Sequence, residues 1–191
     1  MHDILRGCAG YFWVALGIFW LVGALIAKRT ERTQSPVSRL LQIAPEIAAF
    51  SLLFGRLAGR DWLRWRLLPE DFLFAAWVGL ALTAVGTVFA IWARLWIGRN
   101  WSGHVTIKEQ HELIQNGPYA IVRHPIYAGI LLAILGTALV HGEVRAFLAL
   151  PVAAIGWTFK LRTEESFMTQ QFGAAYVDYK RRVKALLPFV V

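Results

Sequence analysis

The chain has 191 residues, of which 57% are hydrophobic and 17% are charged, and its mean hydropathy is +0.49. Soluble domains carry about 45–50% apolar and about 25% charged residues, so this composition excludes an ordinary soluble domain and, being rich in aromatic residues, a disordered chain. The single cysteine excludes a disulfide framework, and the net charge of +8 on so apolar a chain indicates membrane orientation and no nucleic-acid partner.

Three apolar runs in the first half of the chain are candidates to cross a hydrocarbon core of about 30 Å. Ala9–Ala27 contains no charged residue, and neither does Phe72–Ala93. Leu40–Leu57 is interrupted by Pro45 and Glu46. A glutamate inside a membrane is costly and usually faces protein or a cavity, so this stretch is the weakest of the three candidates.

The last apolar block, 126–161, is divided by polar residues at 141–145. The two halves, Ile126–Val140 and Ala146–Leu161, predict a tight helical hairpin with tilted ends. Small residues along both halves would allow close helix approach, namely Gly129, Gly136, Ala138, Ala149 and Gly156. The expected architecture is therefore all-α and integral to the membrane, with about five transmembrane helices.

Lysine and arginine are distributed unequally between the two sides of such a bundle. Five spans place 6 of the 20 basic residues on the side of the N-terminus and 14 on the other. The positive-inside rule assigns the richer side to the cytoplasm. The segment Arg94–Pro125 and the tail after Leu161 are then both expected to face the cytoplasm.

Two polar segments contain most of the chemically distinctive residues. In the first, the sequence Asn116-Gly117-Pro118 predicts a turn. Pro125 suits the first turn of a helix, which would put His124 at its positive end with Tyr127 near enough to share a pocket. In the second, apolar residues spaced three and four apart predict an amphipathic helix over 162–183, lying on the membrane or covering the first segment.

Several other chemistries are disfavoured by what the motifs lack. The sequence from His111 to Gln115 begins like a zinc-protease helix but has glutamine where the second histidine is needed. The chain has no phosphate loop, no G-x-G-x-x-G turn and no recognisable Ser or Cys nucleophile motif. Taken singly, the histidines are typical of loop anchors at a membrane surface. The basic run 180–182 is typical of a lipid-headgroup patch.

As a set, these residues resemble a known family. Gly117-Pro118-Tyr119 followed by the run from Arg123 to Gly129 resembles the GPY…RHPxYxG signature of the isoprenylcysteine carboxyl methyltransferase family. Glu164-Glu165 and the pattern through Phe172, Tyr176, Tyr179 and Pro188 resemble its C-terminal signature. The likeness covers about half of the chain, and it implies a cofactor-binding region over 94–191, preceded by three helices in 1–93.

The resemblance implies methyl transfer from S-adenosylmethionine without a soluble nucleotide-binding domain. By matching position, the implied cofactor-binding residues are His111, Leu113, Ile114, Tyr119, His124, Pro125, Ile126, Tyr127 and Glu164. Either Lys160 or Arg162 would hold the carboxylate of the methyl acceptor. No metal and no catalytic base is implied, and the acceptor is expected to be a prenylated cysteine or a similar amphiphile, with membrane lipids as surroundings.

The residue chemistry agrees independently with this donor. A carboxylate with aromatic faces suits a cationic sulfonium and ammonium, and histidine, lysine or arginine suits the donor's carboxylate. Methyl transfer to an ionised carboxylate needs alignment and a dry site and no proton transfer. The alternatives are methylation of a phospholipid amine or a small thiol, an NADPH-dependent sterol-type reductase and a non-enzymatic scaffold. The short chain is typical of a prokaryotic inner-membrane protein.

Overall fold

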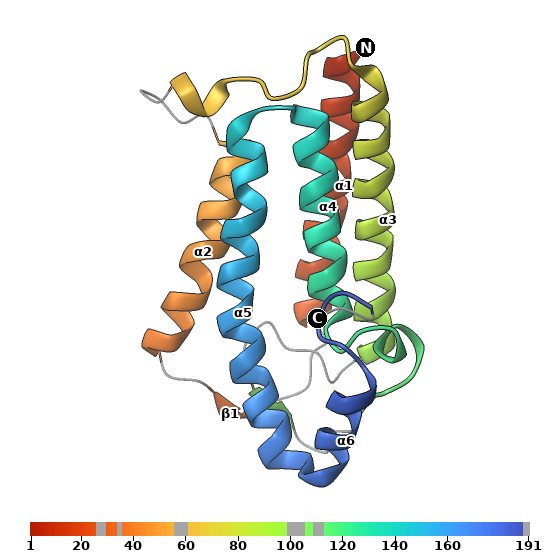
Figure 1. Ribbon diagram of the computed structural model, residues 1–191. Coiled ribbons are helices and arrows are strands. Elements are labelled where there is room, and N and C mark those ends of the chain that lie inside the picture. Colours follow the sequence, from red (N-terminus) through yellow and green to blue (C-terminus); the bar gives the residue numbers. More distant parts are fainter. Residues whose placement is uncertain (26–29, 34–35, 56–60, 99–105, 109–112, 189–191) are drawn as a thin grey trace.

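The computed structural model describes residues 1–191 apart from 26–29, 34–35, 56–60, 99–105, 109–112 and 189–191 (Figure 1). Long helices dominate it, which confirms the expected all-α class. Their bounds are α1 (His2–Leu25), α2 (Pro36–Phe54), α3 (Leu73–Ile97), α4 (Pro125–His141) and α5 (Val144–Phe172). Of these, α1, α3 and α5 are long and apolar enough to cross a membrane, whereas the apolar parts of α2 and α4 are shorter. The number of spans therefore stays a prediction.

Shorter elements lie at the two ends of the bundle. They are the 3-10 turns η1 (Asp61–Arg64) and η3 (Gly117–Ala120), the helix α6 (Ala174–Arg182), and the strands β1 (Thr30–Thr33) and β2 (Thr106–Lys108). The two strands pair antiparallel, with Thr33 opposite Thr106. Segments of three and four residues are too short to show a strand period, so the sequence did not indicate them. Their pairing brings the loops after α1 and α3 to one end of the bundle, as the expected topology requires.

The helices pack as two groups, α5 against α2 and α4 against α3 (Figure 1). Glycines on α3 and α4 interlock: a Cβ on Gly129 would lie 2.6 Å from the carbonyl oxygen of Gly86. The same relation holds between Gly136 and Gly79. The sequence correctly indicates that these residues allow close approach, but α4 directs its glycines at α3 and not across the hairpin.

The predicted hairpin between α4 and α5 is present. Gly142 ends α4 with a φ of 69°, a left-handed conformation that glycine adopts without steric cost. Its carbonyl accepts hydrogen bonds from the backbone N–H groups of Leu67 and Leu68, at 2.7 and 3.2 Å. The loop before α3 and the hairpin tip therefore meet at the end of the bundle opposite the β1–β2 pair.

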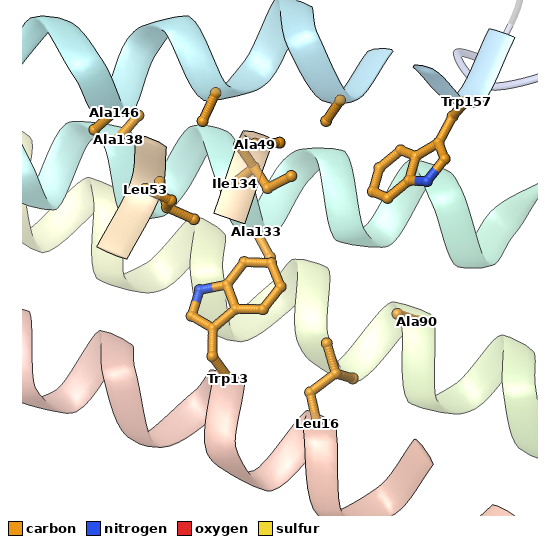
Figure 2. Close-up of a cluster of buried hydrophobic side chains, with 12 residues drawn as sticks. Trp13, Leu16, Ala49, Leu53, Ala90, Ala133, Ile134, Ala138, Ala146 and Trp157 are labelled. Atoms are coloured by element: carbon orange, nitrogen blue, oxygen red, sulfur yellow. The ribbon is translucent and has the colours of Figure 1, made fainter. Parts of the chain in front are cut away.

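The core between the two groups is built from small residues and two tryptophans. Figure 2 shows Trp13 of α1 directed between the helices near the middle of the cluster and Trp157 toward one end of it. The indole N–H of Trp13 donates to the hydroxyl of Thr137 at 2.9 Å, and this hydroxyl lies 3.2 Å from that of Thr83. Pairing these buried polar groups removes the cost of leaving them unsatisfied in an apolar interior.

The predicted amphipathic helix over 162–183 is wrong as a single element. Helix α5 continues without a break to Phe172, Gly173 follows with a φ of 53°, and α6 begins at Ala174. Apolar spacing is the same on both sides of Gly173, so periodicity alone did not reveal the break. With 29 residues, α5 is about 43 Å long, which exceeds a hydrocarbon core. Its C-terminal part carries the acidic pair beside the start of α4.

Candidate functional site

Four side chains from two distant segments meet where α4 begins. The hydroxyl of Tyr127 donates to Glu164 Oε1 at 2.6 Å. His124 lies between the two acidic residues of α5, with Nδ1 3.6 Å from Glu164 Oε2 and Nε2 3.2 Å from Glu165 Oε1. The rings of His124 and Tyr127 are 5.9 Å apart. The predicted proximity of His124 to Tyr127 is confirmed.

The position of His124 follows from local sequence. Pro125 occupies the first turn of α4, where its missing N–H costs nothing, and the carbonyl of His124 accepts the first intrahelical hydrogen bond, from Ala128 at 3.0 Å. This end of a helix attracts negative charge. The carboxylates of Glu164 and Glu165 therefore meet a favourable field as well as the imidazole.

The charge of His124 is set by opposing effects. Burial disfavours the imidazolium, but hydrogen bonds and charges from Glu164 and Glu165 outweigh it, so the pKa of His124 is raised above its ordinary 6.5. Both ring nitrogens face carboxylate oxygens, and only the protonated ring can donate from both. The geometry thus favours a positively charged His124 between two negative groups.

A second set of contacts ties the C-terminal tail to the same place. Arg123 donates to Glu165 at 2.6 Å and to the carbonyl of Val183, while Lys180 lies 2.7 Å from the other oxygen of Glu165. The backbone N–H groups of Arg123 and His124 also donate to the tail, at the carbonyls of Lys184 and Ala185. Lys180, which the sequence placed in a headgroup patch, pairs with an acidic residue of the site.

Tyr119 belongs to the turn that precedes α4. Gly117 has a φ of 59°, and a Cβ there would collide with the Trp96 ring, so the predicted Asn-Gly-Pro turn is confirmed and needs its glycine. The backbone carbonyl of Tyr119 accepts the hydroxyl of Tyr179 at 2.6 Å. Burial, and then the negative charge of Glu164, raise the pKa of Tyr119, so its phenol stays protonated beside that carboxylate.

Lys160 and Arg162 lie in different surroundings. Lys160 is largely buried, with Nζ 3.3 Å from Glu46 Oε1 and 5.4 Å from the centre of the Tyr127 ring. Arg162 is exposed and lines an open polar depression with Glu165 and Lys180. Of the two basic residues, Lys160 is the one beside Tyr127.

The remaining residues expected to bind the cofactor differ in their burial. Pro125 is buried, Ile126 is half-buried at the start of α4, and Leu113 and Ile114 are half-buried in the segment before η3. His111 lies outside the described residues. Among the described residues no group of three or more His, Cys, Asp or Glu could hold a metal ion.

Sequence reasoning did not connect two residues with this site. Trp157 stacks near Tyr127, with ring centres 5.5 Å apart, and donates its indole N–H to Glu46 Oε1 at 2.9 Å. Glu46 faces protein, one of the two surroundings expected of a glutamate in an apolar run, but nothing in the sequence indicated that its partners lie on α5. An acidic residue in an otherwise apolar run is the signal that could have found it.

The side chains that meet at the start of α4 include both negatively and positively charged groups. The carboxylate of Glu164 is bonded to Tyr127 and lies close enough to Tyr119 to act on its phenol, and a carboxylate with aromatic rings near it suits a cation. The imidazole of His124 and the ammonium of Lys160 suit anionic groups. The residues therefore fit a ligand that combines positive and negative charges.

Several known proteins are similar to this chain over much of its length. The profile of the phospholipid methyltransferase family matches residues 74–175. A probable protein-S-isoprenylcysteine O-methyltransferase of Oryza sativa subsp. indica is 32% identical over 131 residues, covering 65% of this chain and 68% of the relative. The protein-S-isoprenylcysteine O-methyltransferase of Schizosaccharomyces pombe is 26% identical over 199 residues, covering 95% of this chain and 84% of the relative.

A solved structure, that of a eukaryotic intramembrane Ras methyltransferase, matches with a TM-score of 0.54 and 24% identity. The match covers 84% of this chain and 55% of that one, so this chain spans about half the length of the solved protein. At this identity the likeness shows the fold alone.

Proposed function

The chain belongs to the isoprenylcysteine carboxyl methyltransferase family and is an integral membrane methyltransferase, and on that premise we propose that it methylates the carboxylate of a lipophilic acceptor with S-adenosylmethionine as the donor. The observation that carries the proposal is the convergence of His124, Tyr127 and Glu164 at the start of α4. The acceptor we propose is a prenylated cysteine or a similar amphiphile, reached from the membrane.

The side chains at this site fit the proposed donor. S-adenosylmethionine supplies a methyl group on a positively charged sulfur and carries an ammonium and a carboxylate at its methionyl end. Glu164 and the tyrosine faces match the positive groups, and the raised pKa of His124 provides a cation for the carboxylate. We place donor binding in 94–191, with Leu113, Ile114, Pro125 and Ile126 as apolar contacts.

Lys160 is our choice for the residue that binds the acceptor carboxylate. Its ammonium lies against the ring of Tyr127, whose hydroxyl is bonded to Glu164, so the two proposed ligands would meet around one tyrosine. An ionised carboxylate needs no base, so Lys160 would act by orienting the attacking oxygen while Tyr127 and Trp157 keep water away. We propose that this site faces the cytoplasm, because its end of the bundle contains the richer set of basic residues.

A phospholipid amine is the second candidate acceptor, since the matching family profile is that of phospholipid methyltransferases. An amine must lose a proton before or during methylation, whereas a carboxylate is already ionised at neutral pH. Radiolabelled methyl transfer from S-adenosylmethionine across prenylcysteines, phospholipid amines and small thiols separates these acceptors. Incorporation into the amines with none into prenylcysteines would contradict carboxyl methylation.

Donor binding is tested by titrating the purified protein in detergent micelles with S-adenosylhomocysteine. Removing a charged hydrogen-bond partner costs about 1.5–3 kcal/mol, so His124→Ala and Glu164→Ala should each weaken binding about tenfold or more. Arg162→Ala, at an exposed position with no contact to Tyr127 or Glu164 among the described interactions, is the control and should bind as the unaltered protein does. Full affinity in both His124→Ala and Glu164→Ala would overturn the proposed site.

A further inference from the structure

Glu46 is an acidic residue in an apolar part of α2. A carboxylate there costs several kcal/mol unless it is paired and hydrogen-bonded. Its partners come from one turn of α5: the indole N–H of Trp157 at 2.9 Å and the ammonium of Lys160 at 3.3 Å. Both reach the same oxygen, Oε1. Glu46 is therefore held at the residue that we propose binds the acceptor.

The two bonds to Glu46 are independent of one another. Trp157 can keep donating to the carboxylate whether or not Lys160 is present, because the indole and the ammonium are separate donors on the same helix face. The side chain of Glu46 is 30% exposed, whereas that of Lys160 is 12% exposed. Glu46 can thus lose its ionic partner and remain hydrogen-bonded to Trp157, and its side chain is less enclosed by protein than that of Lys160.

The backbone around Glu46 is closely held. The neighbouring Pro45 packs against Gly156 of α5, where a Cβ would collide with the proline ring. Helices α2 and α5 cannot come closer here, so a change of partner at Lys160 is a movement of side chains and not of helices.

We propose that Glu46 is a specificity-determining residue that occupies Lys160 when no acceptor is bound and is displaced by the acceptor's carboxylate. This inference rests on the proposed function. An anionic head group replaces one carboxylate at Lys160 by another, which keeps the ammonium paired. A neutral head group that enters the site gains no ion pair with Lys160. A cationic amine would pair with Glu46 and leave the ammonium of Lys160 without a negative partner, and an unpaired charge is costly in a largely buried position. Glu46 thereby favours carboxylate acceptors over amines.

Glu46→Gln is the decisive variant. The amide keeps the side-chain shape and an oxygen for Trp157, and it removes the competing charge. With N-acetyl-S-farnesylcysteine as the probe, KM and the equilibrium dissociation constant in the presence of S-adenosylhomocysteine should both fall about fivefold, the factor that a partly exposed ion pair is worth. Affinity for S-adenosylhomocysteine alone should not change. A dissociation constant for the acceptor that is unchanged or higher would overturn the inference.

A double-mutant cycle separates competition from a merely structural role. In a Lys160→Gln background, Glu46→Gln should no longer tighten acceptor binding, because the ion pair that it relieves is already gone. Equal tightening in both backgrounds would contradict the inference. If the unaltered protein neither binds nor methylates the farnesylated probe, the proposed acceptor is wrong and this inference fails with it. If it does both but Glu46→Gln binds no tighter, only this inference fails.

Discussion

Charged clusters occupy both ends of the bundle, and they differ in what their basic residues bind. At the hairpin end, Arg145 donates to the carbonyls of Leu52, Leu53 and Gly55 and pairs with Glu143. Arg6 at the same end donates to the carbonyl of His141. These arginines satisfy carbonyls that helix C-termini leave without partners. Their role is to tie α2 and α4 to their neighbours.

At the other end, His124, Tyr127 and Lys160 bind side-chain carboxylates. Side-chain partners can exchange for those of a ligand, whereas carbonyls at a helix terminus cannot be released without loosening the helix. Charged residues can therefore hold a fold together or form a binding site. The contrast between Arg145, which donates to backbone carbonyls, and Lys160, which pairs with a side-chain carboxylate, is tested by the following experiments.

The largest effect on stability is expected at Arg145. Arg145→Leu leaves three carbonyls without this donor and removes the nearer of the two arginines that pair with the half-buried Glu143. Breaking a buried ion pair costs about 3–5 kcal/mol. The free energy of unfolding in micelles should fall by this amount. The fraction that remains folded should bind S-adenosylhomocysteine as before. Weaker donor binding with unchanged stability would remove the distinction between the two ends.

Glu164→Gln should have the opposite profile. The amide retains an acceptor oxygen for Tyr127 but loses the charge, so affinity for S-adenosylhomocysteine should fall about tenfold, as expected for a charged partner, while stability changes little. Tyr127→Phe separates the two contributions, since it removes the hydrogen bond to Glu164 and leaves the charge of the carboxylate. Isothermal titration gives the affinities and thermal melting gives the stability. A large fall in melting temperature with normal affinity would make Glu164 structural.

The pH dependence of stability should report on His124. Its pKa is raised in the folded protein, so its contribution to stability is complete below about pH 6.5 and is lost as the pH rises through the folded value. The melting temperature should therefore fall as the pH increases from 6.5, and His124→Gln should flatten this dependence. A stabilising contribution from His124 that increases with pH would contradict a positively charged His124 in the folded protein.

The smallest effect is expected for a charge pair near the site that is open to solvent. Arg181 and Asp178 of α6 are 3.5 Å apart, and both side chains are largely exposed. Exposed pairs contribute about 0–1 kcal/mol, so Arg181→Ala should change neither the melting temperature nor the donor affinity measurably. A clear loss in either would show that proximity to the site, and not burial, decides the importance of a charge.

Local sequence accounts for much of the site. The Asn116-Gly117-Pro118 turn, the start of α4 at Pro125 and the tight hairpin at Gly142 follow from backbone preferences of glycine and proline, which act within a few residues. The proximity of His124 to Tyr127 follows from helical geometry alone. Motif order further indicated that Glu164 belongs with them.

The sequence by itself determined a helical membrane protein and the residues of its methyltransferase signature, because hydrophobic length and local backbone chemistry are properties of short segments. The tertiary structure alone decided that α4 directs its glycines to α3, that Gly173 separates α6 from α5, and that Lys160 and not Arg162 lies beside Tyr127. It also decided that Glu46 contacts Trp157 and Lys160, since Glu46 lies more than a hundred positions before both of them in the sequence. Which faces of two helices meet depends on the packing of the whole bundle, and no local pattern contains that information.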